Sequence, residues 1–534
     1  MSRTLIVLLL LLTGCAATPP ARGSGGTVTV ATIQQWSGFN PHVPSQGEAI
    51  GLAIGNLIYP SPFVVGPDLS PALNTDLLLG AEVTDKDPLT VVYTIKPEAV
   101  WSDGAPISAD DFVYLWRHMS GRVKDAQVTS ALGYESITSV TGSESGKKVT
   151  VVLDRPFGEW QSLFARLLPA HFLAKQGAEP KSWNEGLISA TPPTAGPFTV
   201  SGHQRGQTLT FSRNAAWKGS RAQADTVVLR YVKDPQAVVQ AMASGEVDIA
   251  TLDPDQSALT QLKALPSVRA ELVPTTTVQF LAFQFGRAPA SELPVRKAVA
   301  LALDVKTVTA KTLGAEGRSF QSVHHLYPAG SPGYTDNLGG RYGAGDAEAA
   351  RAVLEKAGYE RGADGYYRKA GKPLVLRHAL SSGGVTEQQI AVLLQDMLAS
   401  AGIKLDIVTS PDSTYFERVL IPGDYDTLAF GYPGSAFPVS WSEALYTCEG
   451  GYNFQRFCDP AVDELFAAAT GAVDEPARQA AADTIDKELW ARLSLFPLFT
   501  VPDVVAHSTR IAGYRPHPLM EWRLAAAGSW SRQS

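Results

Sequence analysis

The chain has 534 residues, of which 45% are hydrophobic and 18% charged, and its formal net charge is −7. A single hydrophobic core usually stops growing at about 250 residues, so the length predicts two or three lobes. The acidic balance and the lack of a long run of Lys and Arg exclude nucleic acid as a partner, because that binding needs a basic surface.

The N-terminus has the pattern of an export signal. Arg3 precedes an apolar run over residues 5–12, and Leu-Thr-Gly-Cys stands at residues 12–15. The run is shorter than the roughly 20 apolar residues of a membrane span, so it is typical of a cleaved signal peptide. Leu-Thr-Gly-Cys resembles the lipobox of bacterial lipoproteins, in which the cysteine carries the lipid. An ordinary signal peptide with a chance cysteine is the alternative.

We therefore predict a lipoprotein signal peptide over residues 1–14, lipidation of Cys15 and a flexible Gly- and Pro-rich tether over residues 15–26. No later segment has 18 uninterrupted apolar residues, so the lipid is the predicted membrane attachment. The protein is expected outside the cytoplasm, anchored to the cell membrane in the periplasmic or cell-wall space.

The rest of the chain alternates between strand and helix patterns. Ser108 is the predicted N-cap of one helix, and Gly358 is the predicted stop of another. Strands are predicted at 27–33, 91–95, 149–153, 208–212, 405–408 and 428–430, and helices at 110–117, 293–303, 346–357 and 388–399. This alternation predicts an α/β protein with mixed sheets.

Two cysteines lie close together near the C-terminus. Cys448 and Cys458 form an even pair in a chain that is predicted to be exported. A disulfide between them closes a short loop and contributes roughly 3 kcal/mol by the loop-entropy argument. A metal site is the alternative, but neither Cys-x-x-Cys spacing nor a nearby histidine supports it. We predict the disulfide.

No catalytic residue, metal site or cofactor is predicted. Residues 142–147 are similar to a phosphate-binding loop but have one residue too few between the glycines, so a turn before a strand is predicted. The chain lacks Gly-x-Ser-x-Gly and His-Glu-x-x-His. His324 and His325 form a doublet without further indicated ligands, so a loop pair is expected. Since no nucleophile is paired with a base, we do not predict an enzyme.

One long segment carries a recognisable pattern. Residues 93–112 read Tyr-Thr-Ile-Lys-Pro-Glu-Ala-Val-Trp-Ser-Asp-Gly-Ala-Pro-Ile-Ser-Ala-Asp-Asp-Phe, a strand, an Asp-Gly turn and a helix start. This segment resembles the signature of family 5 extracellular solute-binding proteins, which include the oligopeptide- and dipeptide-binding components of ABC importers. Further similar blocks occur in the family's order, one before this segment at 39–42 and the others after it at 196–198, 213–217, 244–249, 295–304 and 357–359. The residues of these blocks are most similar to those of an actinobacterial subgroup of the family.

The resemblance implies a three-lobed, periplasmic-binding-protein-like α/β fold (class II, cluster C) with a hinged ligand cleft. It implies a monomer that captures oligopeptides or another small solute and passes them to an ABC permease and ATPase complex. The implied domains are lobe I (27–55, 191–277 and 507–534), lobe II (56–190) and lobe III (278–506).

The resemblance also implies the residues of the ligand cleft. Gly431 would let a ligand backbone approach closely, and Tyr432 would offer a flat surface with a polar tip. The predicted ligand-binding residues are Trp36, Ser45, Gln46, Gly47, Tyr134, Gly431, Tyr432, Ser435 and Trp441.

One position departs from the family pattern. Family peptide binders carry an acidic residue in Gly-Trp-x-x-Asp that pairs with the free amine of the peptide, and Ser435 stands at that position here. A buried ammonium without a carboxylate is costly to bind. Either Glu443, Asp424 or Glu48 supplies the acid, or the ligand has no free amine.

Three hypotheses follow. The first is a receptor for oligopeptides. The second keeps the fold and changes the ligand to a metal chelate, haem, a sugar or a lipid headgroup. The third is an envelope lipoprotein that assists glycolipid assembly without transport.

Overall fold

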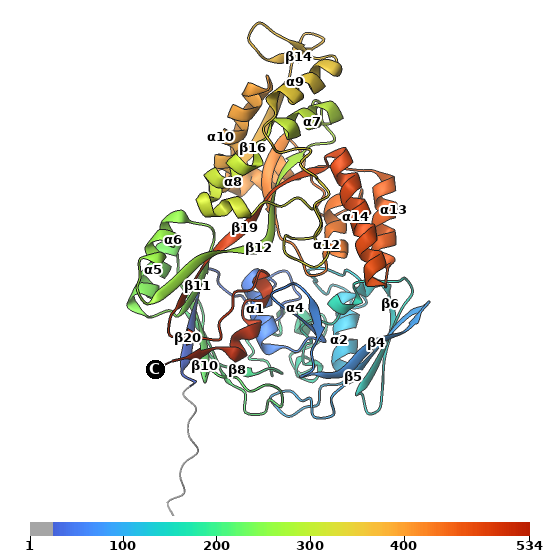
Figure 1. The fold of residues 1–534 in the computed structure, drawn as a ribbon. Helices are drawn as coiled ribbons and strands as arrows, with labels where there is room; N and C mark the ends of the chain where they lie inside the picture. The colour runs from blue at the N-terminus through green and yellow to red at the C-terminus, as the bar shows by residue number, and fades with distance from the viewer. Residues whose placement is uncertain (1–24, 534) are drawn as a thin grey trace, which may run out of the picture.

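The computed structural model describes residues 25–533, so the predicted signal peptide, Cys15 and most of the predicted tether lie outside the described residues. Figure 1 shows two bodies, one above the other. We call residues 25–267 and 509–533 the lower body and residues 284–494 the upper body. Two long strands, β12 (Val268–Phe283) and β19 (Leu495–Ser508), pass between them.

One ten-stranded sheet runs through both bodies. Its order is β17-β16-β18-β12-β19-β11-β1-β10-β9-β8, with parallel pairs at β1–β10, β1–β11, β16–β17 and β16–β18 and antiparallel pairs elsewhere. The other strands of this sheet are β17 (Lys404–Ser410), β16 (Val375–Ser381), β18 (Thr427–Tyr432), β11 (Ile249–Leu252), β1 (Thr27–Thr32), β10 (Thr226–Tyr231), β9 (Thr208–Arg213) and β8 (Phe198–Gln204). The predicted α/β class with mixed sheets is confirmed.

The lower body adds a four-stranded antiparallel sheet of order β4-β5-β7-β6. Its strands are β4 (Leu78–Lys86), β5 (Leu89–Ile95), β7 (Lys148–Leu153) and β6 (Ile137–Ser143), and short pairs join β2 (Phe63–Val65) with β3 (Pro71–Leu73) and β20 (Ile511–Ala512) with β21 (Ser531–Arg532). Its helices are α1 (Ala49–Ile58), α2 (Ala109–Met119), α3 (Ala170–Leu173), α4 (Lys181–Glu185), α5 (Pro235–Ser244) and α6 (Gln256–Lys263).

The upper body is more helical. Its helices are α7 (Leu293–Ala302), α8 (Val305–Leu313), α9 (Ala347–Lys356), α10 (Val385–Ser400), α11 (Asp412–Tyr415), α12 (Pro438–Tyr446), α13 (Pro460–Gly471) and α14 (Glu475–Arg492). A small sheet of β13 (Glu360–Arg361), β14 (Tyr367–Lys369) and β15 (Lys372–Pro373) lies at its far tip.

The β12–β19 ladder is interrupted where it crosses between the bodies. Pro274 faces Pro502, and the next register pair is Val278 with Thr500. Proline cannot donate a ladder hydrogen bond, so two facing prolines weaken the pairing at this point. The Thr275 hydroxyl instead donates to the Val501 carbonyl at 2.6 Å. The predicted lobe boundaries at 277 and 506 fall within these two strands, and the division into three lobes stays a prediction.

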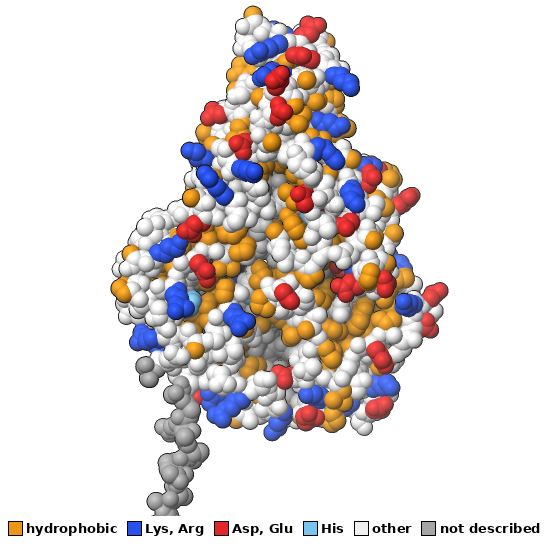
Figure 2. Space-filling model, in the orientation of Figure 1, with side chains coloured by type: hydrophobic (Ala, Val, Ile, Leu, Met, Phe, Trp, Pro, Cys, Tyr) orange, Lys and Arg blue, Asp and Glu red, His pale blue; other side chains and the backbone are white. Residues whose placement is uncertain are grey.

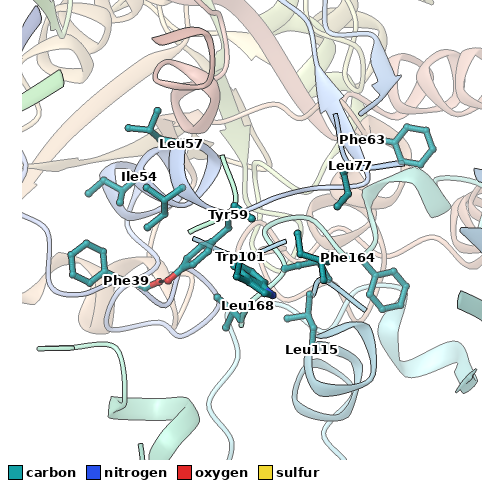
Figure 3. Close-up of a cluster of buried hydrophobic side chains, with 14 of the residues drawn as sticks. Phe39, Ile54, Leu57, Tyr59, Phe63, Leu77, Trp101, Leu115, Phe164 and Leu168 are labelled. Carbon is teal, nitrogen blue, oxygen red and sulfur yellow. Dashed lines mark hydrogen bonds between the residues drawn. The ribbon is translucent and has the colours of Figure 1, made fainter. Parts of the chain in front are cut away.

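The lower body contains one large core. Figure 3 shows part of it, in which the Tyr59 hydroxyl donates to the Phe39 carbonyl at 2.9 Å and the ring of Trp101 is fully buried. This core includes residues of predicted lobe II together with strands of predicted lobe I. Two cores fill the upper body, and a smaller one lies beneath α5 and α6.

The signature segment folds as its residues predict. Gly104 has a φ of +88°, and the Asp103 carboxylate accepts from the Ala105 amide at 3.2 Å, which forms the turn. The Ser108 hydroxyl then accepts from the Asp110 amide at 3.3 Å, so the predicted N-cap of α2 is confirmed. The predicted strands and helices elsewhere overlap observed elements, with ends that differ by a few residues.

Candidate functional site

The loop over residues 433–437 connects β18 to α12 at the junction of the bodies. The Gly434 amide donates to the Thr276 carbonyl at 3.0 Å, and the Thr276 hydroxyl donates back to the Gly434 carbonyl at 3.2 Å. A Cβ at Gly434 would lie 2.7 Å from the Thr276 carbonyl oxygen, so only glycine fits without movement. The Trp441 indole holds the other side of the loop by donating to the Pro433 carbonyl at 2.6 Å. The loop is therefore fixed to the interrupted part of β12.

A cavity of about 260 Å³ lies against this loop and is walled by both bodies. Ser435 lines it, and the Ser435 hydroxyl accepts a hydrogen bond from the Phe437 amide at 3.0 Å. The lower body contributes Leu69, Ser70, Pro71, Glu159 and Gln161, and the upper body contributes Tyr327, Ser331, Pro332, Ser435, Ala436, Phe437, Pro438, Glu475, Arg478 and Gln479. A molecule in this cavity would contact both bodies at once.

Glu159 connects the lower body to the first turn of α12. Its side chain is 4% exposed, and its carboxylate accepts from the amides of Val439 at 3.1 Å and Ser440 at 2.9 Å and from the Ser440 hydroxyl. Burial raises the pKa of Glu159, although the hydrogen bonds from Ser440 and Val439 and the charge of Arg478 act to lower it. The carboxylate thus satisfies donors that a helix N-terminus leaves free.

Arg478, in the first turns of α14, makes a second link. Its Nη1 donates to the carbonyls of Gly158 and Ala472, both at 3.0 Å, and the Gly158 amide donates to the Thr470 carbonyl at 2.7 Å. A Cβ at Gly158 would lie 2.1 Å from the Ala472 carbonyl oxygen, so this approach also requires glycine.

Apolar contacts complete the junction. Ala436 and Phe437 of the upper body pack against a cluster formed by Val65, Leu69, Leu519 and Trp522 of the lower body. Figure 2 shows hydrophobic side chains gathered along the line where the bodies meet. In this conformation the two bodies are in direct contact through polar and apolar groups.

A buried histidine pair holds the upper wall of the cavity against α14. His325 bonds through Nδ1 to the Asp486 carboxylate at 2.6 Å, and His324 Nδ1 accepts from the Tyr327 amide at 3.1 Å. Burial lowers the pKa of His324. Although burial acts to raise it, the hydrogen bond and charge of His325 hold the pKa of Asp486 below its ordinary value. Within residues 25–533 no group of three or more His, Cys, Asp or Glu has the arrangement of a metal site.

The lower-body residues predicted to contact ligand do not line this cavity. Trp36 donates to His203 at 2.9 Å, the Tyr134 hydroxyl accepts from the Phe164 amide at 2.7 Å, and both rings lie in the lower core. Gln46 is 1% exposed, with its amide bonded to the Asn40 amide and the Asn184 carbonyl. Gly47 is packed against Pro41, Val43 and Thr129, and Ser45 is exposed. Ligand contact by these five residues stays a prediction.

The predicted residues of the upper body lie closer together. The rings of Tyr432 and Trp441 have centroids 5.8 Å apart, and Tyr452 contacts Tyr432 with centroids 6.0 Å apart. Gly431 is exposed at the end of β18 beside Tyr432. Of the nine predicted ligand residues, Ser435 alone lines the 260 Å³ cavity.

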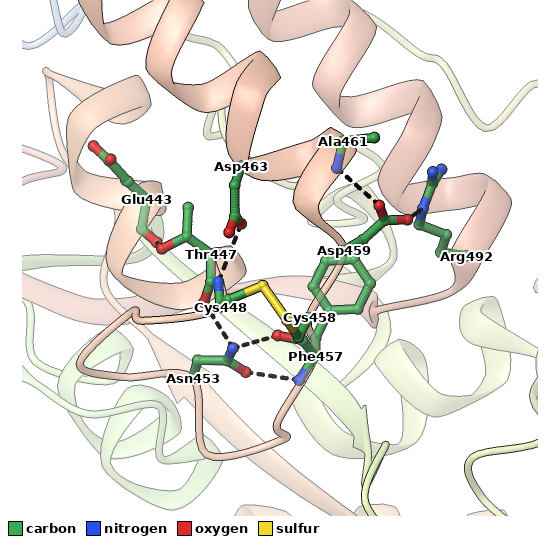
Figure 4. The surroundings of a disulfide bond; sticks show 10 residues. All are labelled: Glu443, Thr447, Cys448, Asn453, Phe457, Cys458, Asp459, Ala461, Asp463 and Arg492. Carbon is green, nitrogen blue, oxygen red and sulfur yellow. Dashed lines mark hydrogen bonds and ion pairs between the residues drawn. A yellow bond between two sulfur atoms is a disulfide. The ribbon is translucent and has the colours of Figure 1, made fainter.

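The predicted disulfide is present and braces this aromatic group. Cys448 and Cys458 are joined with their Cα atoms 4.4 Å apart, closing the loop that carries Tyr452. Figure 4 shows Asn453 inside the loop, where its side-chain amide donates to the Thr447 carbonyl at 2.8 Å and accepts from the Phe457 amide at 3.0 Å.

The three acids considered as replacements at Ser435 are engaged elsewhere. Glu443 accepts from the Thr470 hydroxyl at 3.3 Å, Asp424 pairs with Arg377 and Arg287 at 2.8 Å, and Glu48 accepts from Ser37 at 3.2 Å. Glu159 and Arg478 were not predicted from the sequence. Neither belongs to a motif, and only the meeting of two segments some 280 to 320 residues apart brings them to the junction.

The sequence matches the family model for bacterial extracellular solute-binding proteins, family 5, over residues 70–453. The oligopeptide-binding protein OppA of Mycobacterium tuberculosis is 29% identical over 526 residues, which cover 96% of this chain and 86% of OppA. The probable monoacyl phosphatidylinositol tetramannoside-binding protein LpqW of the same species is 32% identical over 331 residues, which cover 60% of this chain and 51% of LpqW.

Solved structures show the same architecture. The periplasmic EDTA-binding protein EppA superposes with a TM-score of 0.88 at 29% identity and covers 96% of this chain and 97% of its own. The oligopeptide-binding protein AppA from Bacillus subtilis, in complex with a nonapeptide, gives a TM-score of 0.75 at 20% identity, with coverage of 96% and 99%. Between residues 25 and 533, none of the helices combines the length and apolar character that a membrane crossing requires.

Proposed function

Because the chain belongs to the bacterial extracellular solute-binding proteins of family 5, we propose that it is the solute-capturing component of an ABC importer. The proposed solute is an oligopeptide, held between the two bodies and delivered to a membrane permease driven by an ATPase. The proposed location is outside the cytoplasm, with the chain held to the cell membrane by lipid on Cys15 and acting as a monomer.

The similarity to OppA, which extends over 96% of the chain, is the observation that carries the peptide proposal. The cavity supports it, because its walls come from both bodies and a bound solute would join them. A site placed between two bodies allows binding energy to drive closure.

The proposed mechanism uses the β12–β19 crossing as the hinge. The ladder there is interrupted at Pro274 and Pro502, so rotation costs few hydrogen bonds. On closure, Glu159 meets the first turn of α12 and Phe437 enters the cluster around Trp522. The closed surface would then be what the permease recognises.

The test is binding by the full chain, extracted in mild detergent without refolding. Native mass spectrometry should release a ladder of peptide masses, and added tetra- and pentapeptides should bind with micromolar or tighter affinity and change Trp fluorescence. A protein that releases no peptide and binds none from a mixed library would refute the peptide proposal.

The second candidate keeps the fold and replaces the peptide by a non-peptide solute. The similarity to EppA at 29% identity favours it. The serine at residue 435, where the family resemblance leads us to expect the amine-binding acid, supports it as well. A single released metal chelate would support this candidate, as would haem, a sugar or a lipid headgroup. A released glycolipid would be in line with the similarity to LpqW. Together with no dependence of uptake on a permease, it would favour an accessory role in envelope assembly.

A further inference from the structure

The cavity beside Ser435 contains one cationic side chain with unused hydrogen-bond donors. Arg478 is the only Lys or Arg that lines it within the described chain. Its Nη1 is bound to the carbonyls of Gly158 and Ala472, whereas Nε and Nη2 have no protein acceptor among residues 25–533. A guanidinium has five N–H donors in a fixed plane, so one edge of this group is held and the edge formed by Nε and Nη2 is free.

The acids of the cavity do not compete for that free edge. Both carboxylate oxygens of Glu159 accept from the first turn of α12, so Glu159 is already committed. Glu475 also lines the cavity, but its side chain is exposed and makes no ion pair with Arg478 in the described structure. An exposed carboxylate is well solvated and its charge is screened.

The remaining polar groups are neutral and include further donors. Gln161 comes from the lower body and Gln479 from α14, and neither side chain has a protein partner within the described residues. Tyr327 adds a hydroxyl, and burial raises its pKa to about 12, so this hydroxyl stays protonated at neutral pH. The cavity therefore offers a planar cationic edge together with neutral donors, while its two acids are either hydrogen-bonded to α12 or exposed to solvent.

Resting on the proposed function, we propose that Arg478 binds a carboxylate of the solute side-on through Nε and Nη2, in the cavity beside Ser435. A carboxylate fits because its two oxygens match two parallel N–H groups, and a charged pair of this kind is stronger than a neutral hydrogen bond. An ammonium group finds no uncommitted buried acid among the residues that line the cavity. The carboxylate comes either from the C-terminus of a peptide or from a small polycarboxylate.

Because Nη1 of Arg478 also contacts the Gly158 carbonyl of the lower body, the same guanidinium joins the solute to closure. A solute carboxylate bound to Nε and Nη2 would neutralise the charge of this guanidinium and would favour the conformation in which the bodies meet. Solute selection and closure would thus share one side chain.

Three probes test the assignment by isothermal titration of the full chain in detergent: N-acetyl-tetra-alanine with a free carboxylate, the same peptide as its C-terminal amide, and EDTA. We expect the wild-type protein to bind the acid at least tenfold more tightly than the amide. Arg478→Gln should abolish this preference, and Arg478→Lys should keep part of it, because it retains the charge but loses the fork. Lys487→Gln, which removes an exposed charge from the same helix, should leave the preference intact.

The outcomes separate this assignment from the proposed function. Equal binding of acid and amide overturns the carboxylate assignment while leaving a peptide receptor. Binding of EDTA alone, lost in Arg478→Gln, keeps the assignment and identifies a polycarboxylate as the source. The peptide proposal is then decided separately, by the peptide release and the mixed-library binding described above. Binding of neither acid overturns the assignment. Thermal unfolding of each variant shows whether it is folded, and a preference retained by folded Arg478→Gln also overturns the assignment.

Discussion

Helices α12 and α14 both begin at the junction of the two bodies, but their first turns are stabilised in different ways. The N-cap residue of α12, Phe437, provides no side-chain cap, and Glu159 of the lower body accepts the free amides instead. The N-cap residue of α14, Asp474, accepts from the Ala477 amide at 3.0 Å. The start of α12 is therefore completed only when the bodies meet, whereas α14 is complete within the upper body.

The C-terminal end of α12 is fixed by the disulfide, and removing it should have the largest effect. Replacing Cys448 and Cys458 by Ser opens the loop that the disulfide closes between two residues ten positions apart. We expect a loss of roughly 3 kcal/mol in the free energy of unfolding, measured by denaturant titration. Hydrogen exchange should accelerate over residues 433–458 more than over α14. Reduction of the wild-type protein should reproduce the loss, and equal acceleration in both helices would contradict the comparison.

Glu159→Ala tests the cap that crosses the junction. It removes the acceptor of the Val439 and Ser440 amides, and hydrogen bonds to a charged group contribute about 2 kcal/mol. We expect closure to weaken by about this amount, which small-angle X-ray scattering would record as a larger radius of gyration. Glu475→Ala is the matched control, since Glu475 lines the same cavity but is exposed. An unchanged radius for Glu159→Ala would show that closure does not depend on this cap.

The contrast between the two helices also shows which features the sequence could predict: short-range contacts, but not long-range ones. The Asp474 cap, like the confirmed Ser108 cap, is local, because the capping side chain lies within three residues of its donor. The Cys448–Cys458 bond joins residues only ten positions apart, and it was predicted because the two cysteines form an even pair in a chain expected to be exported. Glu159 acts on residues some 280 positions away, and no local pattern reports that contact.

The candidate site was predicted only in part for a related reason. Ser435 was placed by family resemblance and does line the cavity. Gln46 and Tyr134 were also placed by family resemblance, which identifies a segment but not the direction of its side chains. Their polar atoms are bound inside the lower body in this conformation. Arg478 lacked a motif, and its free edge is visible only once its Nη1 partners are known.

Asp474→Ala should have a smaller effect, confined to the upper body. Loss of an N-cap typically costs about 1 kcal/mol. We expect thermal unfolding at a slightly lower temperature and an unchanged radius of gyration, because the cap of α14 does not cross the junction. A radius that rises as it does for Glu159→Ala would mean that both helices depend on closure.

Acidification should tighten closure at the junction but lower the stability of the upper body. Near neutral pH this is the smallest of the expected effects. The pKa of Glu159 is raised in the closed state, so closure takes up a proton and tightens as the pH falls through that raised pKa towards 4.5. Glu443, which faces Glu135 and Arg155 across the junction, also has its pKa raised by burial and adds to this trend. Around α14, the pKa of His324 is lowered from 6.5 and that of Asp486 from 3.8.

At His324 and Asp486 the unfolded chain binds more protons than the folded chain. The upper body therefore loses stability as the pH falls below 6.5, because of His324, and loses more below 3.8, because of Asp486. Scattering and thermal unfolding measured together from pH 7.5 to 4.5 should show tighter closure and a falling melting temperature. Glu159→Gln should weaken the first trend, leaving the part that is due to Glu443, and should not change the second. If both trends have the same sign, the junction is not governed by the buried carboxyl, and α12 and α14 do not differ in the way their caps imply.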